Sequence, residues 1–213
     1  MKTIIFDVDD TLTTNNSWMR LNTAAGVTPE EDYALYSGYM AGDFDYESWT
    51  RQLSALYKSR GVLTRQSAKT ALNNFELKAG VIETITACRD RGYTIMLLSG
   101  GFVTMAEAVG EQVLADVVYA TSDISFDDAG NFDHFISGGE EGEAKANILR
   151  TYCTKENIAL TDCIALGDSE NDVPLFKLTG NGVTFTWCKP DIQSAARNII
   201  EDIRDFPALL DIL

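Results

Sequence analysis

Short apolar runs recur along the chain, and serine, glycine or acidic residues directly follow three of them. Ile4-Ile5-Phe6, Tyr93–Leu98 and Ile164–Leu166 have the length and apolar character of buried strands. From Gly80 onward, strand patterns of this kind alternate with helical patterns. This alternation predicts an α/β fold with a mainly parallel sheet and helices on both of its faces.

The segment between the first strand and Gly80 has a different pattern. It contains no convincing buried strand, but apolar residues recur there at helical spacing: Trp49, Leu53, Leu56 and Tyr57. We therefore expect a small helical cap domain at residues 14–77, inserted after the first strand into a core made of residues 1–13 and 78–213. Aromatic residues at helical spacing are expected mainly in the core of this cap.

Two carboxylates, Asp7 and Asp9, follow the first strand directly. In an extended chain they share one face while Val8 points to the other. They repel each other and hydrate well, so packing alone does not explain them. Phosphoryl transfer does: Asp7 would be the nucleophile that forms an aspartyl phosphate, and Asp9 the general acid and base. For this motif alone, a polar loop is the alternative.

Ser99-Gly100-Gly101 follows the second strand, and a helical pattern begins at Phe102. A small hydroxyl group and backbone N–H groups at a strand-to-helix turn can hold a phosphate. We predict that the Ser99 hydroxyl and the Gly100 amide bind phosphate. Simple capping of the following helix by Ser99 is the alternative, and both roles are compatible.

Lys145 stands near the start of a predicted helix that carries Ile148, Leu149 and Tyr152 on its apolar face. A lysine at this end of a helix opposes the helix dipole, which suggests a functional reason for its position. We expect Lys145 to neutralise Asp7 and the phosphoryl oxygens. A solvated surface lysine is the alternative.

The third strand runs into Gly167-Asp168-Ser169-Glu170-Asn171-Asp172. Asp168 and Asp172 are four residues apart and can converge. Oxygen ligands of this kind suit Mg²⁺. The predicted metal ligands are Asp7, the backbone carbonyl of Asp9, and Asp168. Asp172 would lie just outside the metal ligands and hold a water molecule or Lys145. Asn171 is a further candidate phosphate ligand. A solvated acidic loop is the alternative.

Because the carboxyl ends of parallel strands meet at one edge of a sheet, these sites are expected to converge. Together they resemble the haloacid dehalogenase-like superfamily of phosphohydrolases, in particular its phosphoserine phosphatase branch. The resemblance rests on Asp7-Val8-Asp9-Asp10-Thr11-Leu12, Leu98-Ser99-Gly100-Gly101-Phe102, Lys145 and Gly167–Asp172. It implies a Rossmann-like core, a helical cap after the first strand, and Mg²⁺. It also implies that Asp7 is the nucleophile, that Ser99 and Lys145 bind the phosphate, and that Asp168 binds the metal.

Substrate recognition departs from the pattern of that branch. Phosphoserine phosphatases carry a cap glutamate for the substrate ammonium and a cap arginine for its carboxylate. An ungapped alignment places Asn16 and Leu53 there, with Arg51 on another face of the same helix. Losing both charged partners reduces discrimination by a few kcal/mol. We therefore expect a small neutral or differently charged phosphomonoester rather than phosphoserine, with Asn16, Met40 and Tyr46 as candidate pocket residues.

Composition narrows the function classes further. The formal net charge of −15 argues against partners such as nucleic acid or an anionic membrane. The four cysteines match no zinc pattern and are expected to be buried free thiols in a reducing cytoplasm. There is no signal-peptide layout, and no apolar run approaches the ~20 residues that span a bilayer. We therefore expect a cytoplasmic enzyme; the sequence indicates no particular oligomeric state.

Three alternatives to a hydrolase stay open at this point. A phosphotransferase would differ only in using an acceptor alcohol in place of water. A non-catalytic protein that binds a phosphorylated ligand is the second. A signalling receiver domain also combines aspartate, a hydroxyl residue, lysine and Mg²⁺, but it would have about half this length and no counterpart of Asp9.

Overall fold

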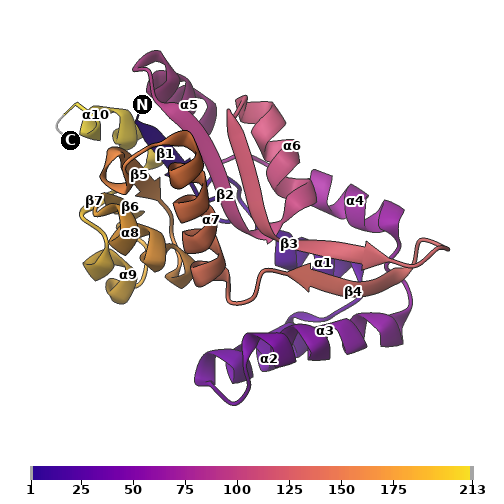
Figure 1. The fold of residues 1–213 in the computed structure, drawn as a ribbon. Helices are drawn as coiled ribbons and strands as arrows, with labels where there is room; N and C mark the ends of the chain where they lie inside the picture. Colours follow the sequence, from indigo (N-terminus) through magenta and orange to yellow (C-terminus); the bar gives the residue numbers. More distant parts are fainter. Residues whose placement is uncertain (1, 212–213) are drawn as a thin grey trace.

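The computed structural model describes residues 2–211, and in them one sheet organises the chain (Figure 1). Its strands are β1 (Thr3–Phe6), β2 (Thr94–Phe102), β3 (Val117–Phe126), β4 (Phe132–Ser137), β5 (Cys163–Leu166), β6 (Gly182–Phe185) and β7 (Asn198–Ile200). Their order across the sheet is β4-β3-β2-β1-β5-β6-β7. All neighbours are parallel except β3 and β4, which form an antiparallel hairpin. The predicted α/β class with a mainly parallel sheet is confirmed.

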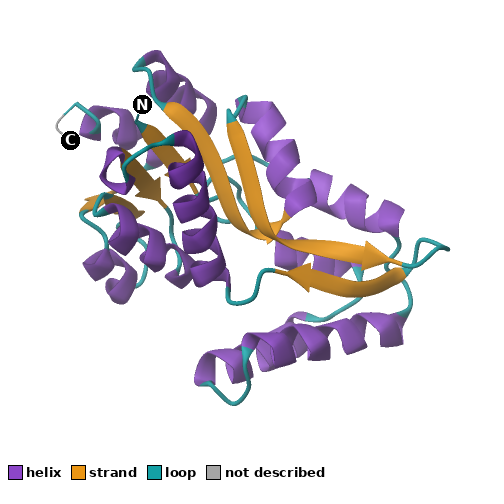
Figure 2. Ribbon diagram, viewed as in Figure 1, coloured by secondary structure: helices purple, strands orange, loops and turns teal. Residues whose placement is uncertain are grey.

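Helices cover both faces of this sheet (Figure 2). Those that follow the cap are α5 (Val81–Asp90), α6 (Val103–Val113), α7 (Glu141–Glu156), α8 (Val173–Thr179), α9 (Pro190–Ala195) and α10 (Phe206–Leu209). In Figure 1, α7 passes in front of the sheet and α6 lies behind it. Short 3₁₀ turns are η1 (Leu160–Asp162), η2 (Glu170–Asp172) and η3 (Ile203–Asp205).

The central strand β1 places the site. All four of its residues are buried, because β2 and β5 flank it and helices cover both faces. Phe6 lies opposite Leu97 of β2 and Leu166 of β5. Three strands therefore reach nearly the same level, so the residues that follow Phe6 and Leu166 emerge together at one edge of the sheet.

The second strand is longer than predicted. β2 continues through Ser99-Gly100-Gly101 to Phe102, with a register shift against β3 between Ser99 and Phe102. The carbonyl of Gly100 accepts hydrogen bonds from the hydroxyls of Thr121 and Ser122 at 2.9 and 3.2 Å, which holds the irregular segment to β3. The helix α6 begins at Val103 without a side-chain cap, so the helix-capping alternative for Ser99 is wrong.

The segment after β1 forms the expected helical cap: α1 (Ser17–Ala24), α2 (Pro29–Ala41), α3 (Tyr46–Arg60) and α4 (Arg65–Asn73). The hairpin of β3 and β4 reaches from the core sheet to this cap, as Figure 1 shows. There Tyr57 of α3 packs on Phe132 of β4 with ring centroids 5.0 Å apart, and Thr64 pairs with Asn131.

Two linker segments connect the cap to the core, and they lie side by side. Thr13 pairs with Leu77, the amide of Thr14 donates to the carbonyl of Glu76 at 2.9 Å, and the amide of Lys78 donates to the carbonyl of Leu12 at 2.8 Å. The division into a core of residues 1–13 and 78–213 and a cap of residues 14–77 stays a prediction.

The structure also bears on the cysteines and on the search for a membrane-spanning helix. Cys88, Cys153, Cys163 and Cys188 are all free and buried, as predicted. Within residues 2–211, the structure contains no helix with the length and apolar character needed to cross a membrane.

Candidate active site

Lys145 joins three polar side chains at the carboxyl ends of β1 and β5. Its Nζ donates to Asp7 Oδ1 at 2.6 Å, to Asp172 Oδ1 at 2.8 Å and to Asn171 Oδ1 at 2.8 Å. Lys145 comes from the start of α7 and is completely buried, so the alternative of a surface lysine is wrong. The backbone N–H of Asp7 donates to the carbonyl of Leu166 at 2.9 Å, which fixes this aspartate at the strand end.

The loop after β5 turns its acids back toward the same point. Asp172 Oδ2 accepts hydrogen bonds from the backbone N–H groups of Asp168 and Ser169 at 3.0 and 3.1 Å. The hydroxyl of Thr11 donates to Asp168 Oδ1 at 2.5 Å and ties this loop to the segment after β1. As a result, carboxylate oxygens of Asp7, Asp168 and Asp172 lie within 4.8 Å of one another.

These carboxylates carry more negative charge than Lys145 neutralises. Burial, helped by the charges of Asp172 and Asp168, raises the pKa of Asp7 well above its ordinary value, although Lys145 acts against this. Burial and the charge of Asp172 raise the pKa of Asp168 to about 7. Burial alone lowers the pKa of Lys145, but the charges of Asp172 and Asp7 outweigh it and leave this pKa raised. One buried cation among three convergent carboxylates leaves a site that fits a divalent metal ion with oxygen ligands.

Asp9 has one anchored and one unpaired carboxylate oxygen. Its Oδ2 accepts a hydrogen bond from the hydroxyl of Ser17, the first residue of α1, while Oδ1 is buried without a hydrogen-bond partner among residues 2–211. Burial raises the pKa of Asp9 to about 6, and the hydrogen bond from Ser17 partly opposes this rise. A carboxyl group with a pKa near neutrality is suited both to give and to take a proton. The backbone carbonyl of Asp9, which is also a predicted metal ligand, lies two residues after Asp7 in the chain.

The Ser99-Gly100-Gly101 segment approaches the site too closely for side chains at either glycine. The amide of Gly101 donates to the hydroxyl oxygen of Ser99 at 2.9 Å. A Cβ on Gly100 would lie 2.6 Å from Glu141 Oε2 and 2.8 Å from Asn171 Nδ2. The lack of a side chain therefore lets the backbone of Gly100 form part of the wall of the site.

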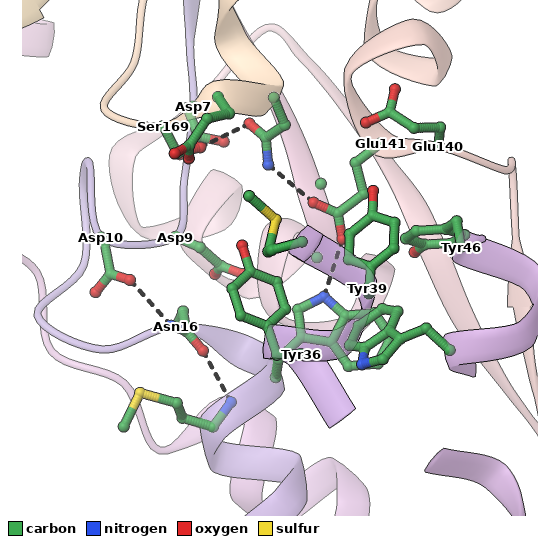
Figure 3. Close-up of a pocket in the computed structure, with 18 of the residues that line it drawn as sticks. Asp7, Asp9, Asp10, Asn16, Tyr36, Tyr39, Tyr46, Glu140, Glu141 and Ser169 are labelled. Carbon is green, nitrogen blue, oxygen red and sulfur yellow. Dashed lines mark hydrogen bonds between the residues drawn. The ribbon is translucent and has the colours of Figure 1, made fainter. Parts of the chain in front are cut away.

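A cavity of about 360 Å³ opens between this site and the cap (Figure 3). Among the predicted site residues, it is lined by Asp7, Asp9, Gly100, Asp168 and Asn171, and by the predicted pocket residues Asn16, Met40 and Tyr46. Ser99, Lys145 and Asp172 are buried and do not belong to this lining.

The side chain of Asn16 is already engaged in the folded chain. Its Oδ1 accepts a hydrogen bond from the amide of Met19 at 2.8 Å and so caps α1, while its Nδ2 donates to Asp10 Oδ2 at 3.0 Å. Leu53 is fully buried in the cap core, and Arg51 is exposed and donates to Ser48 at 3.0 Å. None of these side chains supplies a cation to the cavity.

Sequence reasoning missed Glu141, which also lines the cavity. Its Oε1 accepts from Trp18 Nε1 at 3.2 Å, and its Oε2 accepts from Asn171 Nδ2 at 2.8 Å. Burial raises the pKa of Glu141 to about 7, and the hydrogen bonds from Asn171 and Trp18 act against this. Its spacing of four residues from Lys145, which puts both on one face of α7, is the signal that could have revealed it.

Comparisons with known proteins agree with this geometry. The family model of haloacid dehalogenase-like hydrolases matches residues 4–177. The phosphoserine phosphatase of Methanocaldococcus jannaschii is 31% identical over 211 residues, which cover 96% of this chain and 95% of that protein. A phosphoserine phosphatase of Polaromonas sp. is 28% identical over 211 residues, covering 94% and 85% of the two chains.

Solved structures show the same relationship. A phospho-aspartyl intermediate analogue of phosphoserine phosphatase superposes with a TM-score of 0.82 at 29% identity, covering 100% of this chain and 98% of the other. A substrate-bound phosphoserine phosphatase complex gives a TM-score of 0.80 at 28% identity, with the same coverage. The chain therefore belongs to the haloacid dehalogenase-like hydrolases and is a phosphatase of the phosphoserine phosphatase type.

Proposed function

We propose that this phosphatase hydrolyses a small phosphomonoester through an aspartyl phosphate on Asp7, with Mg²⁺ as its cofactor and with a substrate other than phosphoserine. The observation that carries the proposal is the convergence of Asp7, Lys145 and Asp168 at the end of β1, with Asp9 beside them. The resemblance to a solved phospho-aspartyl analogue at 29% identity supports the same chemistry.

In the first step, a carboxylate oxygen of Asp7 attacks phosphorus while the bond to the leaving oxygen breaks. Lys145 holds the carboxylate of Asp7 in place and offsets the negative charge that gathers there. Asp9, in its protonated form, gives its proton to the leaving oxygen. The substrate alcohol departs, and the phosphoryl group stays on Asp7.

In the second step, the ionised Asp9 takes a proton from a water molecule. The water oxygen attacks phosphorus, and the bond between phosphorus and Asp7 breaks. Inorganic phosphate leaves, Asp7 is again a carboxylate, and Asp9 is again protonated. The hydroxyl of Ser99, the amide of Gly100 and the side chain of Asn171 are the proposed phosphate ligands.

The proposed Mg²⁺ ligands are Asp7, the carbonyl of Asp9, and Asp168, with Asp172 holding Lys145 at 2.8 Å beside them. When bound, the ion supplies positive charge against the phosphoryl oxygens and the clustered carboxylates.

The cavity supports a substrate without a carboxylate. Among residues 2–211, its lining includes acidic side chains but no lysine, arginine or histidine. The carboxylate of phosphoserine would therefore lie among like charges and without a cationic partner, which costs affinity.

Phosphate release from a panel of phosphomonoesters, with and without Mg²⁺, tests the proposal. We expect Mg²⁺-dependent release from at least one small ester and weaker release from phosphoserine. Best turnover with phosphoserine would contradict the substrate assignment. Absence of release from every ester, in protein shown to be folded, would contradict hydrolysis; new phosphoesters formed only when acceptor alcohols are added would instead indicate a phosphotransferase.

A further inference from the structure

Glu141 is a partly buried acid in the proposed substrate cavity, and the proposed mechanism does not use it. Both of its hydrogen bonds come from neutral groups, the indole N–H of Trp18 at 3.2 Å and the amide of Asn171 at 2.8 Å. The adjacent cation, Lys145, is already shared among Asp7, Asp172 and Asn171. A cationic ligand would stabilise the ionised form of this carboxylate inside the cavity.

Aromatic rings surround the same end of the cavity, and Figure 3 shows Tyr36, Tyr39 and Tyr46 gathered near Glu141. Trp49 lies at their centre: its ring centroid is 4.9 Å from that of Trp18, 5.8 Å from that of Tyr39 and 5.3 Å from that of Tyr46. Ring faces attract ammonium groups, and several rings around one cavity favour quaternary ammonium in particular.

One further polar group in this wall is unpaired. The indole N–H of Trp49 is buried without a hydrogen-bond partner among the described residues, and the residue is 4% exposed. Trp49 lines the cavity. Because buried polar groups normally find partners, the aromatic wall contains an unsatisfied polar group beside Glu141.

The acid lies close to the phosphoryl end of the site. Asn171 bridges the two, since its Oδ1 accepts from Lys145 and its Nδ2 donates to Glu141, each at 2.8 Å. A Cβ on Gly100, in the proposed phosphate cradle, would lie only 2.6 Å from Glu141 Oε2. A ligand that spans from the phosphate to this carboxylate must therefore be short.

From this placement we infer that the substrate is the phosphate monoester of a short amino alcohol without a carboxylate, its ammonium group held by Glu141 and the aromatic rings. The inference rests on the proposed function and specifies its substrate class. Phosphoethanolamine and phosphocholine share this chemistry: the first carries a primary ammonium that Glu141 would favour, and the second a quaternary ammonium that the rings would favour.

Steady-state kinetics with four esters tests the inference. We expect kcat/KM for phosphoethanolamine or phosphocholine to exceed that for phosphoserine and for the neutral ester glycerol 3-phosphate by about ten-fold or more. Equal or better kcat/KM with phosphoserine or with glycerol 3-phosphate would overturn it.

Matched variants assign the effect to the two parts of the wall. Glu141→Gln should lower the ratio of kcat/KM between the amino-alcohol ester and glycerol 3-phosphate by about ten-fold, because the amide carries no charge. Glu143→Gln is the control, since Glu143 lies on the same helix but is exposed and outside the cavity.

Tyr36→Leu should lower kcat/KM for phosphocholine more than for the other esters. Tyr33→Leu, on the same helix but outside the cavity, is the control and should not have this effect. Equal effects of a variant and its control would contradict the assignment.

A binding measurement separates this inference from the proposed function. Trp18 and Trp49 line the cavity, so their fluorescence reports on its occupation even where no turnover occurs. In Asp7→Asn, phosphocholine or phosphoethanolamine should change this fluorescence at lower concentrations than glycerol 3-phosphate does. That result would support the amino-alcohol site even if hydrolysis failed. Equal affinity for all three esters would overturn the site even if the protein proved to be a phosphatase.

Discussion

The Nζ of Lys145 lies 2.6 Å from Oδ1 of Asp7, although 138 residues separate them in the chain. The lysine is completely buried, and its second carboxylate partner is Asp172 at 2.8 Å. One cation thus links the helix α7 to the residues that follow β1 and β5. The same contact holds the proposed nucleophile in position and offsets part of its charge.

Replacing this lysine should therefore destabilise the protein as well as stop its chemistry. Lys145→Met replaces the ammonium group with an apolar side chain of similar length and leaves the buried carboxylates without their cation. This loss should cost about 3–5 kcal/mol of unfolding free energy. Lys155→Met, on the same helix but with its side chain 75% exposed, should change stability by less than about 1 kcal/mol. Urea unfolding of both variants checks this, and equal stabilities would contradict the buried ion pair.

The proton donor predicts a pH dependence that Ser17 controls. Burial raises the pKa of Asp9 to about 6, so its protonated form is lost as the pH rises through this value. The kcat/KM for alkyl phosphates, whose leaving oxygen needs a proton, should fall above about pH 6, whereas p-nitrophenyl phosphate should show little fall.

Ser17→Ala removes a hydrogen bond that lowers the pKa of Asp9, so the fall should move to higher pH. Thr23→Ala, at an exposed position of the same helix, is the control and should leave the profile unchanged. An identical profile in wild type and Ser17→Ala would argue against Asp9 as the acid.

Metal binding should compete with protons at Asp168. In the metal-free protein burial raises the pKa of this carboxyl to about 7. It is therefore mostly protonated at about pH 5.5 and mostly ionised at about pH 8, and only the ionised form binds a cation. Added Mg²⁺ should raise Tm more at the higher pH. Asp168→Asn should reduce the rise at both pH values; a rise of the same size in this variant would remove Asp168 from the predicted metal ligands.

A methyl group at Gly100 should impair activity far more than stability. It would lie 2.6 Å from Glu141 Oε2 and 2.8 Å from Asn171 Nδ2, so both side chains must move out of the proposed phosphate and substrate sites. We expect Gly100→Ala to lose more than about ten-fold in kcat/KM. Gly138→Ala, whose Cβ would meet that of Ala144 at 3.3 Å, is the control. Wild-type kinetics in Gly100→Ala would show that this backbone does not form the cradle.

Local patterns predicted the architecture of the site because its main residues follow strands. Asp7 directly follows β1, and Asp168 lies two residues after the end of β5. These two strands are neighbours in the sheet, with Phe6 opposite Leu166. Parallel neighbours bring such positions together whatever the rest of the chain does. Lys145 was harder to place, since a lysine at a helix start is as often solvated, and only the packing of α7 on the sheet buries it.

The misses have long-range causes. The Gly100-Gly101 pair looked like a turn after a strand, yet hydroxyls of Thr121 and Ser122 hold it within β2. The comparison of Asn16 and Leu53 with a family pattern suggested that the cavity lacks charged partners at both ends of an amino acid. The structure supplies a carboxylate from α7, and no local motif links Glu141 to the cap residues it faces.

The most direct test of the account is to trap the covalent intermediate. Asp9→Asn keeps the proposed nucleophile but cannot take a proton from water, so it should accumulate phosphoenzyme when mixed with p-nitrophenyl phosphate and Mg²⁺. Acid quenching, proteolysis and mass spectrometry should then place the phosphoryl group on Asp7, and Asp7→Asn should show none. Phosphate release without any phosphoenzyme, or a phosphoryl group on another residue, would contradict the mechanism.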